Sequence, residues 1–577
     1  MKGRDCMKKI LLITTLILML MTFFSFGASA KIMGYCGEDV MWSLDANNVL
    51  TISGNGKMEI AHNQWVAFVS DISSLVIEEG VTELDADAFH GLRYLKSVSI
   101  PKSVTVIGEN AFSGCSALSE VYLQDLRNWC EIDFDNEFSN PLSNGAALFV
   151  GNQIITDCIL PDGVTQIKPY AFYSSATLNS VIVPEGVTQI AASAFQHSSI
   201  AQMTLPNSLK SIGCRAFSSC SQLTDITLPE GITSIENNAF EWCEALQRVV
   251  LPKKITSISE YTFENCSELS EVIIPAGVTH IGAFAFSGCA SLQELVLPNK
   301  LQNIGVGAFS YCYALRNIEI PKYVRNIDAY AFFGCQSLNG LILPDSLTRI
   351  EEGVFQYCTR LTNLVLPSTV TYIGVSAFSE CTSLTRLVIP NQVTTIDENA
   401  FSHCTGLKEL ILPRSITKIN TGAFYACEQL AAVHYAGTAN NWQKILFTEN
   451  NDKVLLSDIL CTNCTPKKDS TMMCGIVVED TSYNVLSSVP NDSFLVEAVV
   501  TNLSARETCI LFVALYDSNG KLLDTRYLYA NPTVGHTVTF GLGISNPNGV
   551  VAKVKAFVLT DLKTFHILAE ACERVKL

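Results

Sequence analysis

Hydrophobic positions recur along most of the chain with a period of 23 residues. The recurring unit is close to L-x-x-V-x-L-P-x-x-V-T-x-I-G-x-x-A-F-x-x-C-x-x. Ile stands six residues after the proline in all thirteen copies that carry one, from Ile107 to Ile419, and Phe stands eleven residues after it. A fourteenth copy has Glu78 instead of the proline. The prolines lie at positions 101, 161, 184, 206, 229, 252, 275, 298, 321, 344, 367, 390 and 413.

Each unit predicts three short elements. The segment L-x-x-V-x-L, for instance residues 246–251, has the side-chain pattern of a short strand with alternating faces near its end. The proline ends this strand, and V-T-x-I-G predicts a second extended piece. G-x-x-A-F-x-x-C predicts a helical or 3-10 turn whose Phe fills the core between units. Because 23 residues bury too little apolar surface to fold alone, we predict a solenoid of stacked parallel strands.

The unit resembles the BspA-like class of leucine-rich repeats, found on secreted and surface proteins of microbes. The resemblance covers about residues 71–433 and rests on the I-G-x-x-A-F-x-x-C-x-x-L spacing. Residues 31–70 resemble the N-terminal cap of that family, and residues 434–460, with Trp442, resemble its closing segment. Around residues 122–158, which include Trp129, the chain resembles a longer variant repeat.

The end of the chain has a different pattern. Residues 461–475 are polar and carry cysteines, which predicts a linker. From residue 476 to 577 the chain shows about five segments of alternating residues, and residues 517–520 (DSNG) predict a hairpin between two of them. We therefore expect an all-β, sandwich-like domain at residues 476–577.

The first thirty residues predict an export signal. Lys2, Arg4, Lys8 and Lys9 precede an apolar run at residues 10–26, and an A-x-A sequence ends at Ala30. We expect cleavage after Ala30 and a secreted or cell-surface protein with no covalent anchor. The alternative is an uncleaved membrane anchor, because the apolar run approaches spanning length.

Composition excludes several classes of function. Of the 577 residues, 48% are hydrophobic and 16% charged, so the chain is not a disordered protein. The net charge of −17 disfavours nucleic-acid binding, which needs a basic face. The sequence contains no nucleophile elbow, HExxH, P-loop or dinucleotide fingerprint, and its eight histidines are scattered. We expect no enzyme activity, no cofactor and no metal site.

Eleven of the 21 cysteines stand three residues after the repeat Phe. Equivalent positions of stacked units form a column of like side chains, so we expect buried free thiols that donate weakly to the turn backbone. Ser175 and Ser198 occupy two of these positions, where a serine breaks no disulfide. The cluster Cys461, Cys464 and Cys474 lacks a complete second pair for zinc, which favours a linker disulfide or free thiols over a metal.

Two columns of residues are expected to point outward from the predicted strands, two and four residues before the proline. The near column is mostly aliphatic and extends to Ile411, whereas the far column is polar and of mixed charge. Exposed β-branched residues also favour sheet structure without binding anything, but a continuous apolar stripe marks interaction surfaces. The proposed binding face comprises Arg248, Val250, Glu271, Ile273, Glu294, Val296, Asn317, Glu319, Ile342, Asn363, Val365, Arg386 and Val388.

These observations predict an exported solenoid that binds proteins or other cell-surface macromolecules. The BspA-like resemblance implies adhesion to host proteins, host cells or other microbes. A second hypothesis is a structural envelope spacer that displays the C-terminal β domain. A third is that this domain binds carbohydrate through aromatic side chains such as Tyr516, Tyr527 and Tyr529.

Overall fold

The computed structural model describes residues 30–59 and 65–461 and, as backbone, eight strands between residues 472 and 575. The chain divides into two compact units, residues 1–221 and 222–577. The predicted export signal lies outside the described residues, apart from Ala30, where the first strand begins. Both units contain turns of about 23 residues whose strands pair in parallel with equivalent strands, which confirms the predicted solenoid.

In the first unit, the strands that precede the proline form a sheet with the N-terminal strands. β1, β2 and β3 are antiparallel, and β3 pairs in parallel with β5, so the predicted cap extends the sheet of the repeats. The sheet order is β1 (Ala30–Tyr35), β2 (Val40–Asp45), β3 (Val49–Gly54), β5 (Ser74–Ile77), β7 (Ser97–Ile100), β9 (Glu120–Leu123), β11 (Ala147–Val150) and β12 (Gln153–Ile154). The next turns contribute β13 (Asp157–Ile159), β15 (Ser180–Ile182) and β17 (Gln202–Thr204).

The second extended piece of each turn forms its own parallel ladder. In the first unit these strands are β4 (Gly56–Lys57), β6 (Val81–Leu84), β8 (Val106–Ile107), β10 (Asp133–Phe134), β14 (Gln166–Ile167), β16 (Gln189–Ile190) and β18 (Ser211–Ile212). Each repeat Ile closes such a strand and is buried, as Ile190 and Ile212 are.

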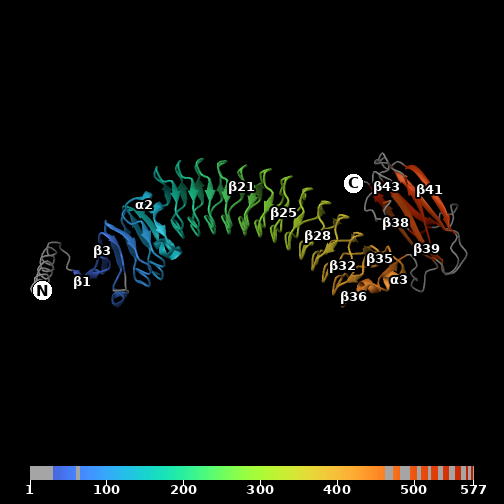
Figure 1. The fold of residues 1–577 in the computed structure, drawn as a ribbon, viewed down its shortest axis with the longest axis horizontal. Helices are drawn as coiled ribbons and strands as arrows, with labels where there is room; N and C mark the ends of the chain where they lie inside the picture. The colour runs from blue at the N-terminus through green and yellow to red at the C-terminus, as the bar shows by residue number, and fades with distance from the viewer. Residues whose placement is uncertain are drawn as a thin grey trace, which may run out of the picture. The chain divides into compact units, whose positions relative to one another are not determined.

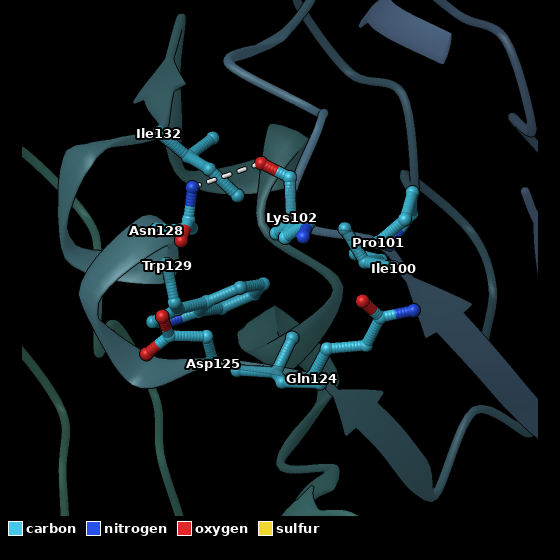
Figure 2. A pocket seen from close by; sticks show the side chains of 9 residues that line it. Ile100, Pro101, Lys102, Gln124, Asp125, Asn128, Trp129 and Ile132 are labelled. Carbon is cyan, nitrogen blue, oxygen red and sulfur yellow. Dashed lines mark hydrogen bonds between the residues drawn. The ribbon is translucent and has the colours of Figure 1, made fainter. Parts of the chain in front are cut away.

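The longer turn of the first unit carries helix α2 (Leu126–Glu131) and the 3-10 turns η3 (Glu137–Ser139) and η4 (Pro141–Asn144). Trp129 is buried, and its indole N–H donates to the carbonyl of Ala171 at 2.7 Å. Figure 2 shows the small hollow beside this helix, where the Asn128 side chain donates to the carbonyl of Lys102 at 2.9 Å. These bonds attach the insertion to the turns around it.

The second unit also contains stacked turns, and Figure 1 shows their strands following one another from β21 to β36. The strands before the proline, with their equivalents β35 and β37 in the closing segment, are β19 (Asp225–Ile226), β21 (Arg248–Val250), β23 (Glu271–Ile273), β27 (Gly340–Ile342), β29 (Asn363–Val365), β31 (Arg386–Val388), β33 (Glu409–Leu412), β35 (Ala432–Tyr435) and β37 (Asp458–Leu460). The strands after it are β20 (Ser234–Ile235), β22 (Ser257–Ile258), β24 (His280–Ile281), β25 (Asn303–Ile304), β26 (Asn326–Ile327), β28 (Arg349–Ile350), β30 (Tyr372–Ile373), β32 (Thr395–Ile396), β34 (Lys418–Ile419) and β36 (Leu446–Phe447). The closing segment adds α3 (Ala439–Trp442) and α4 (Asp452–Leu456).

The C-terminal strands form two antiparallel sheets, as the alternating pattern predicted. One sheet has the order β38 (Met472–Asp480), β39 (Phe494–Asn502) and β42 (Thr537–Ile544). The other contains β41 (Leu522–Ala530), β40 (Cys509–Tyr516), β43 (Lys553–Leu559), β44 (Ile567–Ala569) and β45 (Glu573–Val575). β40 and β41 pair antiparallel on either side of residues 517–521, which confirms the predicted hairpin. β38 begins at Met472, inside the segment expected to be a linker.

The repeat Phe forms the centre of the core. In the second unit successive Phe rings are stacked almost parallel, with centroids 5.5 Å apart for Phe286–Phe309 and 5.4 Å apart for Phe401–Phe424. The backbone N–H of each Phe also donates to the next turn, as from Phe286 to the carbonyl of Ala308 at 2.8 Å. Each turn therefore shares both apolar surface and hydrogen bonds with its neighbour.

The A-F-x-x-C segment is a run of turns rather than a continuous helix. Its hydrogen bonds close three residues apart, as in a 3-10 helix, for example from the N–H of Cys289 to the carbonyl of Phe286. In the longer G-x-x-A-F-x-x-C stretch of each turn, however, two residues have φ near +60°: one stands two residues before the Phe, as Gly353 does with a φ of 60°, and one stands two residues after it, as Tyr357 does with a φ of 62°. These left-handed residues interrupt the helix, which sequence spacing alone does not predict.

Glycine is needed at one of these positions because a ring of the preceding turn lies over it. A Cβ on Gly353 would lie 2.3 Å from Cε1 of Tyr330, and Gly353 has a φ of 60°. We expect Gly353→Ala to destabilise the protein by about 1–3 kcal/mol, through both the clash and the left-handed backbone. Denaturant unfolding measures this. Gly340→Ala is the control, because a Cβ there meets nothing within 4 Å, and equal effects of the two changes would contradict the explanation.

Candidate functional site

The outer face of the strands that precede the proline is exposed as predicted. In β21 the central Val249 is buried, whereas Arg248 and Val250 on either side are exposed. Arg386 and Val388 are half-buried, and the side chain of Asn363 lies outside the described residues. The other predicted face residues in the second unit are exposed: Arg248, Val250, Glu271, Ile273, Glu294, Val296, Asn317, Glu319, Ile342 and Val365.

Two apolar side chains of this face in the second unit are far more exposed than the others. Val296 is 84% exposed and Ile342 is 74% exposed, against 36% for Val250. Between β23 and β27 the turns are joined on this face by isolated bridges, from Glu294 to Asn317 and from Asn317 to Gly340. Val296 therefore lies outside any strand.

Charged residues on this face pair along the far column. Nε of Arg248 lies 2.9 Å from Oε2 of Glu271, and Nε of Arg386 lies 2.8 Å from Oε2 of Glu409. Nε2 of His434 lies 3.3 Å from Oε1 of the same Glu409. Between these pairs, within residues 65–461, Glu294 and Glu319 make no ion pair. Exposed pairs contribute little stability, so the pairing mainly balances charge on the face.

The expectation that Ile411 is exposed on the outer face is wrong. Ile411 is 7% exposed, and three consecutive residues of β33 are buried. In β35 of the closing segment, His434 is paired in register with Ile411 of β33. The outer stripe consequently ends before the last turns.

Sequence reasoning missed the apolar residues on the same face of the first unit. Tyr122 and Phe149 are stacked with their ring centroids 4.8 Å apart, and Ile159 and Ile182 are 69% and 44% exposed. Ile159 and Ile182 stand two residues before Pro161 and Pro184, so the repeat itself carries the signal. Tyr122 and Phe149 lie in the longer turn, where no proline marks the position.

The cysteine ladder has the hydrogen bonding that was predicted. In the second unit Sγ of Cys266 donates to the carbonyl of Phe240 at 3.1 Å, and Sγ of Cys312 donates to that of Phe286 at 3.2 Å. In the first unit Ser198 occupies a ladder position and its hydroxyl lies 3.3 Å from Sγ of Cys220. The buried free thiols of the ladder include Cys115, Cys220, Cys266, Cys289, Cys312, Cys335, Cys358, Cys381, Cys404 and Cys427.

Burial makes these thiols unreactive. Desolvation raises the pKa of Cys312 to about 12 and that of Cys220 to about 12, because the thiolate has no water around it. The thiolate is the nucleophile and the metal ligand, so the ladder is a structural element. By contrast, Cys461 is disulfide-bonded, which is one of the alternatives predicted for the linker cluster.

Glu241 and Glu264 are carboxylates at equivalent positions of neighbouring turns in the second unit. Burial, with the neighbouring Glu241 carboxylate, raises the pKa of Glu264 to about 7. Other acidic residues have ordinary partners: Oε1 of Glu351 lies 2.7 Å from Nε of Arg349. Nδ1 of His403 lies 3.9 Å from Oε1 of Glu380, and the ring of His280 forms a hydrogen bond with the hydroxyl of Thr279.

Among the described residues, no group of three or more His, Cys, Asp or Glu side chains is placed to hold a metal ion.

This fold, with its parallel strands, buried Leu and Ile columns and variable outer positions, defines a leucine-rich-repeat solenoid. The model of the BspA type leucine rich repeat region matches residues 60–140, 145–267, 233–360 and 325–453. The chain belongs to this family, whose members are often surface proteins involved in binding.

A solved bacterial structure supports the same fold, and a second was matched at a lower TM-score. A leucine-rich repeat protein from Bacteroides ovatus is 23% identical with a TM-score of 0.52, and the match covers 74% of this chain and 99% of that one. A leucine rich cell surface protein from Faecalibacterium prausnitzii is 26% identical with a TM-score of 0.35, and the match covers 73% and 99% of the two chains. No curated protein matches the sequence. In the part of the chain that the structure describes, no helix has the length and apolar character needed to cross a membrane.

The buried ladder predicts how the thiols react. In folded protein at neutral pH we expect the ten ladder thiols named above to resist alkylation, because their carbonyl bonds and burial suppress the thiolate. Unfolding without a reductant should release them all, as counted by mass spectrometry after alkylation. Reduction before unfolding is the control. Unchanged masses for the ladder peptides in unreduced, unfolded protein would show that the ladder is oxidised.

The Glu241–Glu264 pair predicts a pH dependence. Because the pKa of Glu264 is raised in the folded state, folding favours its protonated form, and stability falls as pH rises from about 4.5 to about 7. Glu264→Gln removes this loss, so the difference in melting temperature between variant and wild type should grow over that range. Glu268→Gln, an exposed change four residues away, is the control. A constant difference for Glu264→Gln would contradict the assignment.

Proposed function

We propose that this chain is an exported, non-enzymatic protein that binds macromolecules through one face of its solenoid. This is the outer face of the strands that precede the proline in each turn. Adhesion to host proteins, host cells or other microbes is the function that fits this proposal. The observation that carries it is the exposed aliphatic stripe of the second unit, in which Val296 and Ile342 are 84% and 74% exposed.

Strand propensity does not account for this stripe. β-branched residues stabilise a sheet when they pair with neighbours across strands. Val296 lies outside any strand and is the most exposed residue of the stripe. Cross-strand contacts therefore contribute little stability that could explain an exposed valine at this position. An exposed apolar row on a rigid scaffold instead favours a role in binding.

The chemistry of the face favours a protein partner. Aliphatic side chains supply apolar contact, and the charges beside them are partly neutralised by the Arg248–Glu271 and Arg386–Glu409 pairs. The backbone beneath is held by bonds between turns, such as that from Arg316 N–H to the carbonyl of Gln293 at 3.0 Å. A preformed surface of this kind loses little entropy when it binds.

The test is binding of residues 31–577 to immobilised extracellular-matrix proteins and to whole microbial cells. We expect saturable binding that falls at least tenfold in the double variant Ile342→Lys/Val365→Lys, because two cations replace apolar contacts. Thr348→Lys/Thr371→Lys is the matched control: it adds the same charge to the same turns off this face. Equivalent positions already carry Lys210 and Arg325.

Circular dichroism and thermal unfolding establish that both variants are folded. A chain that ends near Thr465 runs alongside them. Binding lost only on this truncation would assign the function to the C-terminal β domain, as the spacer hypothesis requires. Equal binding by the two lysine variants would also overturn the proposal.

A further inference from the structure

Five aromatic side chains form a cluster on the turns of the second unit, away from the strand face. Tyr311, Tyr313, Tyr330, Phe333 and Tyr357 belong to three successive turns, and we call them the aromatic patch. Phe333 is central: its ring centroid lies 5.2 Å from that of Tyr311, 6.0 Å from that of Tyr330 and 5.4 Å from that of Tyr357. Tyr313 adjoins Tyr311 at 6.0 Å. Tyr311, Tyr313 and Tyr357 are each exposed by more than 40%.

Packing within the chain explains part of this patch. Tyr311 lies over Gly334 of the next turn, and Tyr330 lies over Gly353. Tyr313 and Tyr357 cover no glycine, because their counterparts in the next turn are Gln336 and Glu380. Neither of these two exposed rings is therefore matched by a glycine in the next turn.

The turns that carry the rings also carry uncharged and acidic hydrogen-bonding groups. Gln336 and Gln356 carry amides one turn after Tyr313 and Phe333, at the positions equivalent to theirs, and Tyr311, Tyr313 and Tyr357 carry phenolic hydroxyls. The hydroxyl of Tyr330 donates to the carboxylate of Glu352. In the described part of the chain the cation–π contacts involve Tyr323 and Tyr372, so none of the five rings is committed to a cation.

We propose that the aromatic patch binds a neutral oligosaccharide. The C–H faces of sugar rings stack on exposed aromatic rings, and their hydroxyl groups exchange hydrogen bonds with amides and phenols. The patch is too small for a stable protein interface: five rings of about 200 Å² each, three of them exposed by just over 40% and two half-buried, present at most about 400 Å². A standard interface buries about 800 Å² on each partner. This site is separate from the outer strand face, so it does not depend on the proposed function.

The test uses isothermal titration calorimetry of residues 31–577 with malto-, cello-, chito- and manno-oligosaccharides. We expect at least one series to bind, with an affinity that falls at least tenfold in Tyr313→Ala/Tyr357→Ala. Tyr323→Ala is the matched control, since Tyr323 is 54% exposed but lies outside the patch, and it should leave binding unchanged. Ile342→Lys/Val365→Lys should also leave oligosaccharide binding unchanged.

Circular dichroism and thermal unfolding of each variant separate loss of the site from loss of the fold. Absence of heat with all four series at millimolar concentration would overturn the proposal. So would equal binding by the patch variant and the Tyr323→Ala control. If the patch variant instead lost binding to an immobilised protein, the patch would be a protein contact and the glycan assignment would be wrong.

Discussion

The structure depends on contact between equivalent positions of successive turns. A single turn has no core of its own, so each Phe ring stacks on the Phe of the next turn, and each buried thiol donates to a carbonyl of the turn before. Backbone bonds such as that from Phe286 to Ala308 follow the same direction. Because these contacts all require the same register, the inner positions tolerate little variation.

Outer positions are free of this constraint, and the two candidate surfaces lie there. The strand face carries aliphatic and paired charged side chains, whereas the turns carry the aromatic patch. Both surfaces rest on backbone that is already held by bonds between turns. A ligand at either surface therefore meets side chains in fixed rows, and the row spacing is set by the stacking distance rather than by the ligand.

Most of the fold follows from the period of the sequence, because the columns of Ile, Phe and Cys can have one stacked arrangement only. The left-handed residues of the turns were not predicted, since G-x-x-A-F-x-x-C also suits a helix and φ is not encoded in apolar spacing. Ile411 was assigned outward by position, but its environment belongs to the closing segment, where the period stops. The aromatic patch escaped notice for a related reason. Its residues are spread over several columns, and they meet only because Phe333 lies between them.

The thiol–carbonyl ladder has a consequence for how this protein varies in length. Each Cys bonds to the turn immediately before it, and Ser198 takes part in the same column beside Cys220. Loss or duplication of a whole 23-residue turn would thus leave every remaining bond with an equivalent partner. Removal of the turn that contains Phe333 would nevertheless bring Tyr311 next to Tyr357 and eliminate the centre of the patch. The scaffold is consequently robust to changes in repeat number. A site that spans several turns, by contrast, is kept only when all of its turns are retained together.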